Sequence, residues 1–574
     1  MIKKLLPCIG EYKKYTVLAP LTMVGEVLME VLIPLVMSLM IDSGIQKGNL
    51  KYAVLMGLLM VLMAMLSLLF GALSAKFASK ASMGFAKNLR IKLFEKTQDF
   101  SFRNIDKFST ASLVTRLTTD VTNTQNAFMM SIRMAVRAPL MLISATFLAV
   151  SINPELSVVF LVAIPILGLA LYLILTNAHP RFKKMLKLYD LMNSKVQENL
   201  TGIRVVKAYV RESHEENKFV TAADDVRRAQ VAAEKLVILN MPIMQLLMYG
   251  TTVAVIWLGG NMVIKGTFLI GQLSSFISYI MQILMSLMMI SMIFMMVVIS
   301  RASISRICEV LDEKSYITDP ENPVTEVKNG EIEFKNVYFN YNGKKENSVL
   351  EDINFKIKSG ETVGVIGGTG SAKSTLVQLI PRLYDVTDGE ISVGGVNVKD
   401  YHIKTLRDSV AMVLQKNELF SGTIKENLRW GNENATDEEI TEACRAACAD
   451  EFVSEFPDGY DTDLGQGGVN VSGGQKQRLC IARALLKKPK IIILDDSTSA
   501  VDTATDAKIR TAFRENFSDI TAIIIAQRIS SVKDADRIIV IDDGKINAIG
   551  THEELLENNE IYREVYNSQQ KGEE

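Results

Sequence analysis

Long apolar stretches alternate with polar segments along the first half of the chain. Six of these stretches are long enough to cross a hydrocarbon core of about 30 Å as a helix. They cover residues 15–41, 52–75, 131–152, 155–177, 236–264 and 271–299. The pattern therefore predicts an all-α transmembrane domain over residues 1–305.

The links between these stretches differ in length and in charge. Those at 42–51, 153–154 and 265–270 are short, whereas those at 76–130 and 178–235 are long and rich in Lys and Arg. Because positively charged links stay on the cytosolic side, we expect the long links and both chain ends in the cytosol. Apolar residues recur at helical spacing in NSKVQENLTGIRVVKAYVRE, so we expect the membrane helices to continue into these links.

Residues 1–14, MIKKLLPCIGEYKK, mix basic and apolar side chains. This mixture predicts an amphipathic helix at the membrane interface, broken at Pro7, with a disordered tail as the alternative. The apolar stretch that follows is too long for the core of a cleavable signal peptide, so none is expected.

The composition changes near residue 305. Residues 306–328 contain DEKS and TDPENP, which are typical of a linker, and from residue 329 strands and helices alternate between turn signals. This alternation predicts an α/β domain over residues 329–574. The net charge of −1 gives no general reason to expect nucleic-acid binding. The five cysteines lack metal-site spacing and are expected to be reduced cytosolic thiols.

The first motif in the α/β domain that indicates a chemical function is a phosphate-binding loop. The apolar run VGVI leads into GGTGSAKST and then into the apolar helix LVQLIPRL, which is the strand, turn and helix context that such a loop requires. Its backbone amides face phosphates, Lys373 reaches the terminal phosphates, and Ser374 offers a hydroxyl to Mg²⁺. Ala372 stands where the template GxxxxGK[ST] has Gly, so its methyl is expected to crowd the turn. The predicted cradle comprises Gly367, Gly368, Thr369, Gly370, Ser371, Ala372, Lys373, Ser374 and Thr375.

Further motifs follow this loop in a fixed order. They are Gln415 in VLQKNELF, the run VSGGQKQRLCIARAL at 471–485, the strand IIILDD, SAVD at 499–502 and IIAQR at 524–528. Together they resemble the nucleotide-binding domain of ABC transporters, whose distinguishing signature is SGGQ. The six apolar stretches match the exporter layout of that family, with the membrane and nucleotide domains fused, so the resemblance covers nearly the whole chain.

The resemblance implies a role for most of these residues. Tyr341 is expected to stack on adenine, with Tyr338 as the alternative, and Asp495 and Gln415 are expected to hold Mg²⁺ together with Ser374. The signature is expected to grip the γ-phosphate of an ATP bound to the phosphate loop of a second chain. The residues implied at this dimer interface are Ser472, Gly473, Gly474 and Gln475 in the signature, and Asp502 in the following dimer loop.

Two further residues depart from the family pattern. The family has Glu after the Mg²⁺ aspartate, where it polarises the attacking water. Here the residue is Asp496, whose carboxylate falls short by about 1 Å, a misplacement that can cost ~10²-fold in rate. The family has His at the switch position, where Gln527 cannot carry a mobile proton. With Ala372, three departures fall on one ATP site while the signature is intact. This combination predicts a subunit of a heterodimeric exporter, whose non-identical partner chain carries the complete hydrolytic site.

The cargo is expected to be hydrophobic or amphipathic, of the multidrug type. Met285, Met288 and Met292 in the sixth stretch suit an adaptable apolar pocket, with ordinary packing or lipid contact as the alternative. Glu26 and Glu30 lie inside the first stretch, where carboxylates are costly. Glu26 and Arg137 have equal offsets from the outer ends of their stretches and are expected to form a structural ion pair. The alternative is that Glu30, left without a partner, faces the cavity and attracts cationic compounds.

Other functions remain compatible with these motifs. An importer on the same fold, for instance of a siderophore, is one alternative, and an ATP-gated channel or a regulatory subunit is another. A peptide exporter is less favoured because no protease-like segment precedes the first stretch. The segments SFRNIDKF (101–108) and ESHEENKF (212–219) are expected to form short helices that dock on nucleotide-binding domains. A bacterial cytoplasmic membrane is the expected location.

Overall fold

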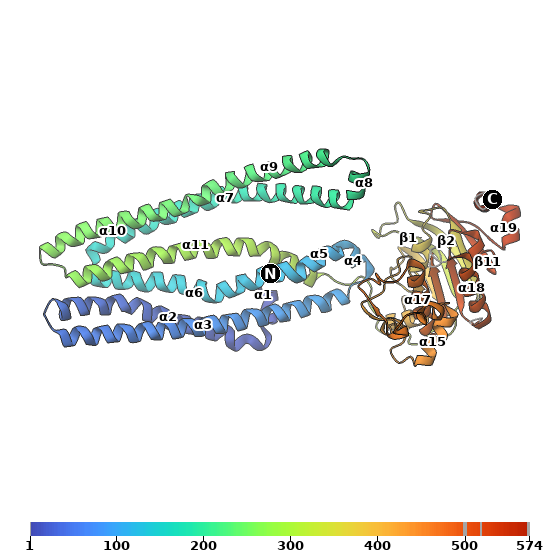
Figure 1. The fold of residues 1–574 in the computed structure, drawn as a ribbon, viewed down its shortest axis with the longest axis horizontal. Helices are drawn as coiled ribbons and strands as arrows, with labels where there is room; N and C mark the ends of the chain where they lie inside the picture. The colour runs from blue at the N-terminus through green and yellow to red at the C-terminus, as the bar shows by residue number, and fades with distance from the viewer. Residues whose placement is uncertain (1, 497–501, 517–518, 571–574) are drawn as a thin grey trace. The chain divides into compact units, whose positions relative to one another are not determined.

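The structure is a computed structural model that describes residues 2–496, 502–516 and 519–570. The chain divides into two compact units, shown in Figure 1. A helical unit comprises Met1–Gln98 and Thr110–Glu313, and an α/β unit comprises Asp99–Ser109 and Lys314–Glu574. The short segment Asp99–Ser109 therefore belongs to the α/β unit by its contacts, although it lies between two helices of the helical unit in sequence.

The helical unit confirms the prediction of six membrane-spanning helices. Within the described residues, six helices are long and apolar enough to cross a membrane. These candidate spans are Lys3–Ile45, Leu50–Gln98, Thr110–Ile152, Pro154–Thr201, Glu212–Ile264 and Ile270–Ile293. Several of them continue far beyond a bilayer thickness, as the helical spacing in the long links predicted.

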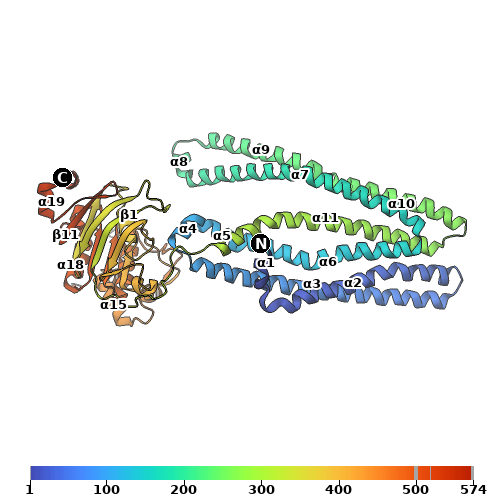
Figure 2. The same ribbon diagram turned by 180° about the vertical axis from the view of Figure 1, so that it is seen from behind.

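The long helices lie side by side in pairs, which both views show (Figures 1 and 2). Helix α2 packs along α3, α6 along α11, and α7 along α9 and α10. The buried seam between them is apolar and includes Val27 and Val31 of α2, Met141 of α6 and Phe276 of α11. The bounds are α2 Lys13–Leu39, α3 Leu50–Gln98, α6 Val121–Ile152, α7 Pro154–Thr201, α9 Glu212–Ile238, α10 Asn240–Ile264 and α11 Ile270–Asp312.

Short irregular helices flank these long ones. The N-terminal helix α1 (Ile2–Leu5) ends before Pro7, and a 3₁₀ segment, η1 (Leu6–Tyr12), bends at Gly10, whose φ of 48° is not helical. The predicted break at Pro7 is thus found within a longer irregular turn. Helix α2 ends in the π-helical turn η2 (Met40–Ile45), and α6 is preceded by α5 (Thr110–Thr115) and the π-helical turn η3 (Arg116–Asp120).

The helix that leads into the α/β unit is longer than the sequence predicted. The linker was expected to begin at residue 306, but α11 continues to Asp312. Its last turns are held by the neighbouring helix, because the Arg306 guanidinium donates to the buried carboxylate of Asp120 at 2.7 Å. Arg116 extends this tie through an ion pair of 2.9 Å with Glu309.

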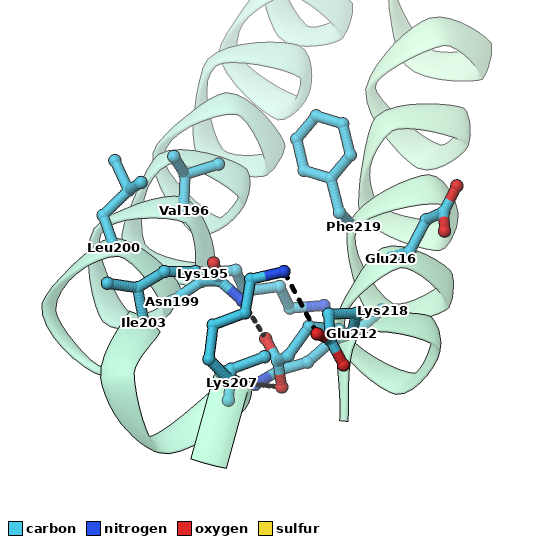
Figure 3. A pocket seen from close by; sticks show the side chains of 12 residues that line it. Lys195, Val196, Asn199, Leu200, Ile203, Lys207, Glu212, Glu216, Lys218 and Phe219 are labelled. Carbon is cyan, nitrogen blue, oxygen red and sulfur yellow. Dashed lines mark hydrogen bonds and ion pairs between the residues drawn. The ribbon is translucent and has the colours of Figure 1, made fainter. Parts of the chain in front are cut away.

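The prediction that residues 212–219 form a separate short helix is wrong. Residues 212–219 form the first two turns of the long helix α9, and the short helix at this end is α8 (Ile203–Ala208). A pocket of about 340 Å³ lies beneath α8, between the end of α7 and the start of α9, as Figure 3 shows. Val196, Leu200, Ile203 and Phe219 form its apolar wall. The turn between α8 and α9 carries an ion pair of 3.0 Å between Lys207 and Glu212.

The first docking segment does form a separate short helix, α4 (Phe102–Phe108). Its Asn104 is fully buried and donates to the Lys314 carbonyl at 2.9 Å. The Tyr384 hydroxyl donates to the Asp106 carboxylate at 2.8 Å, and the Tyr384 ring meets that of Phe102 edge to face. These contacts make α4 part of the α/β unit.

The α/β unit is built on two main sheets. The order of the first sheet is β2-β1-β4-β5 and that of the second is β12-β11-β3-β10-β9-β6, while β7 and β8 form a small separate pair. Strand pairs β11–β3, β3–β10, β10–β9 and β9–β6 are parallel. The strands are β1 Ile332–Phe339, β2 Leu350–Ile357, β3 Thr362–Gly367, β4 Asp388–Val393, β5 Val396–Asn397, β6 Val410–Val413, β7 Gly422–Thr423, β8 Asp463–Leu464, β9 Ile491–Asp495, β10 Thr521–Ile525, β11 Arg537–Asp542 and β12 Lys545–Gly550.

Helices cover the second sheet and continue from its strands. All five residues of β9 are buried, which explains why this strand reads as an unbroken apolar run rather than an alternating one. The helices are α12 Lys373–Gln378, α13 Ile403–Ser409, α14 Ile424–Arg429, α15 Asp437–Ala446, α16 Asp450–Val453, η4 Gly459–Asp461, α17 Gly473–Leu486, α18 Thr503–Asn516, η5 Ile529–Ser531, α19 His552–Asn558 and α20 Glu560–Gln570.

Candidate nucleotide-binding site

Parallel strands bring the predicted site residues to one edge of the second sheet. Strand β3 runs into the phosphate loop, β9 ends at Asp495, Gln527 follows β10, and Gln415 follows β6. These four strands are neighbours in the order β3-β10-β9-β6. Ligands of open α/β sheets bind outside the carboxyl ends of such strands, so the topology itself collects these residues.

The phosphate loop has the backbone that the motif requires. Gly370 has a φ of 86°, and Ala372, which stands in place of a second Gly, has a φ of 71°. A left-handed conformation strains a residue with a Cβ, so Ala372 holds the loop geometry at a cost. The predicted departure therefore does not remove the loop.

Lys373 lies folded against this loop. Its ammonium donates to the carbonyls of Gly367 at 3.0 Å and Gly368 at 2.8 Å and lies 3.3 Å from the Ser371 hydroxyl. Burial lowers the pKa of Lys373, while the charges of Asp496 and Asp495 act in the opposite direction. The Lys373 ammonium therefore places positive charge at the loop, where phosphate oxygens would accept hydrogen bonds from the same N–H groups.

The residues expected to hold Mg²⁺ come together. The Ser374 hydroxyl donates to Asp495 Oδ1 at 2.9 Å, joining the start of α12 to the end of β9. Asp495 is 2% exposed, and burial raises its pKa, with the neighbouring Asp496 acting in the same direction and the Ser374 hydrogen bond in the opposite one. A hydroxyl and a carboxylate at this distance present the hard oxygen ligands that Mg²⁺ prefers.

Asp496 makes contacts that the sequence did not foresee. Its Oδ2 accepts from Gln527 Nε2 at 2.8 Å, and the side chain of Gln415 makes a second hydrogen bond to the same carboxylate. Burial raises the pKa of Asp496, and both of these hydrogen bonds counteract that effect. The residue that the family resemblance places at the position of the water-polarising base therefore accepts hydrogen bonds from Gln527, which follows β10, and from Gln415, which follows β6.

Tyr341 lies nearer the phosphate loop than its alternative. Its hydroxyl is 2.9 Å from the Thr375 hydroxyl on α12, and its ring meets that of Tyr384 edge to face at 5.2 Å. Tyr338 instead contacts Lys345, whose ammonium nitrogen lies 4.2 Å from the centroid of the Tyr338 ring. Tyr341 also lines a pocket of about 240 Å³. Of the two tyrosines, Tyr341 has the geometry for a role beside bound nucleotide.

The signature begins a long helix and is exposed. Ser472 caps α17: its main-chain N–H donates to Gln475 Oε1 at 2.8 Å, and the Gln475 amide donates to the Ser472 hydroxyl at 3.3 Å. Ser472 and Gly473 are exposed and Gly474 is half-buried. The free amides at the start of this 14-residue helix suit an anion. Asp502 similarly caps α18 by accepting from the Thr505 amide at 2.9 Å, whereas residues 499–501 of the SAVD motif lie outside the described residues.

The membrane carboxylates differ from the prediction. Arg137 pairs with Glu26, as expected from their equal offsets, but it also binds Glu30 Oε2 at 2.7 Å. The prediction that Glu30 has no partner is therefore wrong. One helical turn separates Glu26 from Glu30, so both side chains face the same guanidinium. Met285 and Met292 are exposed on one face of α11, while Met288 packs against the apolar seam.

Two residues that brace the site were not among those predicted from the sequence. Gln569 of α20 donates to the Gln527 carbonyl at 2.7 Å and accepts from the Ile529 amide at 2.9 Å, which fixes the switch backbone. Tyr384 connects Tyr341 to Asp106 of α4. Both act across large sequence separations, and no local motif marks them.

Comparisons with known proteins agree with this geometry. Residues 16–287 match the family model described as the ABC transporter transmembrane region, and residues 350–499 match the family model described as ABC transporter. The chain is 39% identical to the ABC transporter ATP-binding protein YfiB of Bacillus subtilis over 99% of this chain and 98% of that one. It is 33% identical to YgaD of the same organism, provisionally named a multidrug export ATP-binding/permease protein, over 84% of this chain and 83% of that one.

A solved structure shares the fold. It is a bacterial Atm1-family ABC exporter with ATP bound, which aligns with a TM-score of 0.83 and 24% sequence identity over 97% of this chain and 98% of that one. The likeness extends over the membrane helices and the α/β unit together. The chain therefore belongs to the ABC transporter family, as an ATP-driven half transporter of the exporter fold with six candidate membrane spans fused to one ATP-binding domain.

Proposed function

We propose that this chain is one subunit of a heterodimeric ABC exporter of hydrophobic or amphipathic compounds. It lies in a bacterial cytoplasmic membrane, with the ATP-binding domain and both chain ends in the cytosol. Its own phosphate loop binds Mg²⁺ and ATP but supports slow hydrolysis. Its signature completes a second, faster site on a non-identical partner chain.

The observation that carries this proposal is the state of Asp496. A competent base must reach a water molecule beside the terminal phosphate, and a carboxylate displaced by about 1 Å loses ~10²-fold in rate. The Asp496 carboxylate is short and already accepts from Gln527 at 2.8 Å. The adjacent switch residue is an amide, which neither holds positive charge nor passes on a proton.

The remaining parts of the site favour binding of nucleotide. Lys373 and the loop amides provide donors for phosphate oxygens, and Tyr341 provides an aromatic face for adenine. Ser374, Asp495 and Gln415 supply oxygen atoms that would hold Mg²⁺. When bound, the ion neutralises charge on the phosphates, while the residues named here position it.

The intact signature supports the second half of the proposal. Ser472 and Gly473 are exposed at the start of α17, so the helix can receive a γ-phosphate from outside this chain. A chain that only bound nucleotide, as a regulatory subunit or a gated channel would, has less use for an exposed phosphate-gripping helix. This feature favours the exporter over that alternative.

The helical unit supports an apolar cargo. Met285 and Met292 offer flexible, polarisable side chains on one face of α11. The relative YgaD is named for multidrug export, which agrees with this class.

ATP hydrolysis by the purified chain tests the proposal. The full-length chain alone, in lipid nanodiscs, is expected to hydrolyse ATP at least tenfold more slowly than the chain purified with its native partner. A chain that hydrolyses ATP equally fast on its own would refute the heterodimeric assignment. Flux into inverted membrane vesicles separates export from import, since ATP-dependent accumulation inside such vesicles is the expected direction.

A further inference from the structure

We infer that Asp496 and Gln527 form a matched pair whose hydrogen bond, joined by Gln415, holds this ATP site in its non-hydrolytic state. Asp496 is then a positioning residue that ties the switch to the β6 loop, and it does not serve as a base. The inference rests on the proposed function, since it explains how slow hydrolysis arises. It differs from the simpler view that each substitution is a separate defect.

The backbone of Asp496 is fixed before its side chain is considered. Its amide donates to the Ile525 carbonyl at 3.0 Å, so the residue is attached to the end of β10 as well as to β9. Its φ is 47°, in the left-handed region. Asp and Asn adopt that region more readily than residues with longer side chains. The local backbone therefore suits the short carboxylate.

The carboxylate is held by amide donors. Gln527 Nε2 donates to Oδ2 at 2.8 Å, and Gln415 makes another hydrogen bond to the same group. A carboxylate is an acceptor only, so Gln527 must present its nitrogen and turn its oxygen away. The Asp496 carboxylate is therefore short, and it already accepts hydrogen bonds from two side chains.

The main chain of Gln527 is also held by a hydrogen bond. Gln569 donates to the Gln527 carbonyl at 2.7 Å and accepts from the Ile529 amide at 2.9 Å. The switch backbone is thus tied to the C-terminal helix α20, which fixes the point from which the Gln527 side chain reaches Asp496. Burial strengthens the arrangement, since Asp496 is 9% exposed and competing water is scarce.

This geometry predicts how the family residues would behave if restored. Asp496→Glu alone places a longer carboxylate against Gln527 and Gln415, which continue to hold it away from water. Gln527→His alone supplies a titratable ring beside a carboxylate that is still too short. Only the double substitution both removes the Gln527 amide donor and restores the reach of the carboxylate, so the two effects must be strongly non-additive.

The test is a double-mutant cycle on the full-length chain, purified alone in lipid nanodiscs. ATP hydrolysis is measured for the original chain, Asp496→Glu, Gln527→His and the double variant at saturating Mg²⁺ and ATP. Each single variant is expected within about threefold of the original chain. The double variant is expected at least tenfold above the product of the two single effects. A filter-binding measurement with radioactive ATP verifies that each protein still loads nucleotide.

Two further measurements separate the pair from a general structural effect. Adding Lys373→Met to the double variant should abolish the gain, because the activity must come from this phosphate loop. The double variant should also lose activity below about pH 6.5, where an imidazole titrates, and the original chain should show no such step. Full activity from Asp496→Glu alone, or single effects that multiply to give the double, would overturn the matched pair. Fast hydrolysis by the original chain would instead overturn the proposed function.

Discussion

The hydroxyl of Tyr279 on α11 donates to the main-chain oxygen of Val31 on α2 at 2.9 Å, within the apolar part of the helical unit. Both residues are buried. Two more side chains of α11 donate to main-chain carbonyls of α2: the Ser275 hydroxyl to Pro34, and the Gln282 side-chain amide to Glu30 at 3.4 Å. The Gly271 main-chain amide donates to Asp42 Oδ1 in the adjoining turn η2 at 2.6 Å. Pro34 has no N–H, so the Glu30 carbonyl lacks its helical donor and is open to Gln282.

This row of hydrogen bonds between α11 and α2, the α2–α11 seam, predicts the effect of removing one hydroxyl. Tyr279→Phe should lower the free energy of unfolding by about 1 kcal/mol, since it removes one buried hydrogen bond and keeps the ring. Denaturant titration in mixed micelles measures the change. Ser286→Ala is the matched control, because the Ser286 hydroxyl bonds to the Gln282 carbonyl within α11 itself. The control should leave the joint between the two helices intact, so an equal loss in both variants would contradict the role of the seam.

The shared arginine predicts a larger effect. Arg137 binds both Glu26 and Glu30, so Arg137→Gln leaves two carboxylates without their counter-ion in the membrane core. Removing one partner of a buried pair costs about 3–5 kcal/mol. The yield of folded protein after membrane extraction should therefore fall severely. The triple variant with Gln at 26, 30 and 137 carries no charge and should recover most of that yield. A single variant as stable as the original chain would show that the cluster is not structural.

The sequence predicted this cluster only in part, because one of its contacts depends on tertiary packing. Equal offsets from the helix ends identified Glu26 and Arg137 as a pair. The position of Glu30 one turn further along the same face was visible in the sequence. However, nothing in the sequence says how far a guanidinium will bend to reach a second carboxylate. That depends on the packing of α2 against α6, which is tertiary.

The two docking segments illustrate the same limit. The segment 101–108 is bounded by the Ser101 capping box and by Ser109, whose φ is 54°, so its ends are encoded locally. The segment 212–219 has a helical pattern that continues into α9, and the true turn lies earlier, between Gly202 and Val210. Likewise, the α/β motifs fixed the site residues in order, but only the sheet topology shows that Gln527 reaches Asp496.

The contact between Tyr384 and Asp106 predicts an effect on coupling. Tyr384→Phe removes the hydroxyl that donates to Asp106 at 2.8 Å and preserves the rings around Tyr341. Loss of one charge-assisted bond, about 1.5 kcal/mol, should loosen α4 from the ATP-binding domain. Stimulation of ATP hydrolysis by an amphipathic substrate should fall severalfold in the complex with its native partner, while basal hydrolysis stays near its original rate. Asp106→Asn should behave alike and the double variant should be no worse. Additive losses would contradict a direct link.

The left-handed Ala372 predicts a stabilising substitution. Gly adopts a φ of 71° without strain, so Ala372→Gly should stabilise the nucleotide-free ATP-binding domain by about 1 kcal/mol. The loop already has its binding geometry, so the dissociation constant for ATP should change less than twofold. Thermal unfolding and equilibrium nucleotide binding measure the two quantities separately. A large gain in affinity with unchanged stability would mean that the methyl crowds the phosphate rather than strains the loop.

The buried Asp496 predicts a pH-dependent stability. Burial raises the pKa of Asp496 in the folded chain, so the ionised carboxylate is disfavoured there relative to the unfolded chain. The folded state therefore gains stability as the pH falls from the raised pKa towards the usual value of about 4. Asp496→Asn keeps an acceptor for Gln527 and tolerates the left-handed backbone. The variant should be more stable than the original chain at neutral pH, and this difference should vanish near pH 4.

Asp502 serves as a control, because its pKa is shifted in the opposite direction to that of Asp496. The Thr505 backbone amide lowers the pKa of this exposed carboxylate, so its contribution to stability is present above the usual pKa and is lost as the pH falls through the lowered one. Asp502→Asn should thus be less stable than the original chain at neutral pH and approach it in acid. Melting temperatures of the nucleotide-free protein between pH 4 and pH 8 show both trends. A difference between Asp496→Asn and the original chain that is constant with pH would mean that burial of charge does not govern this position.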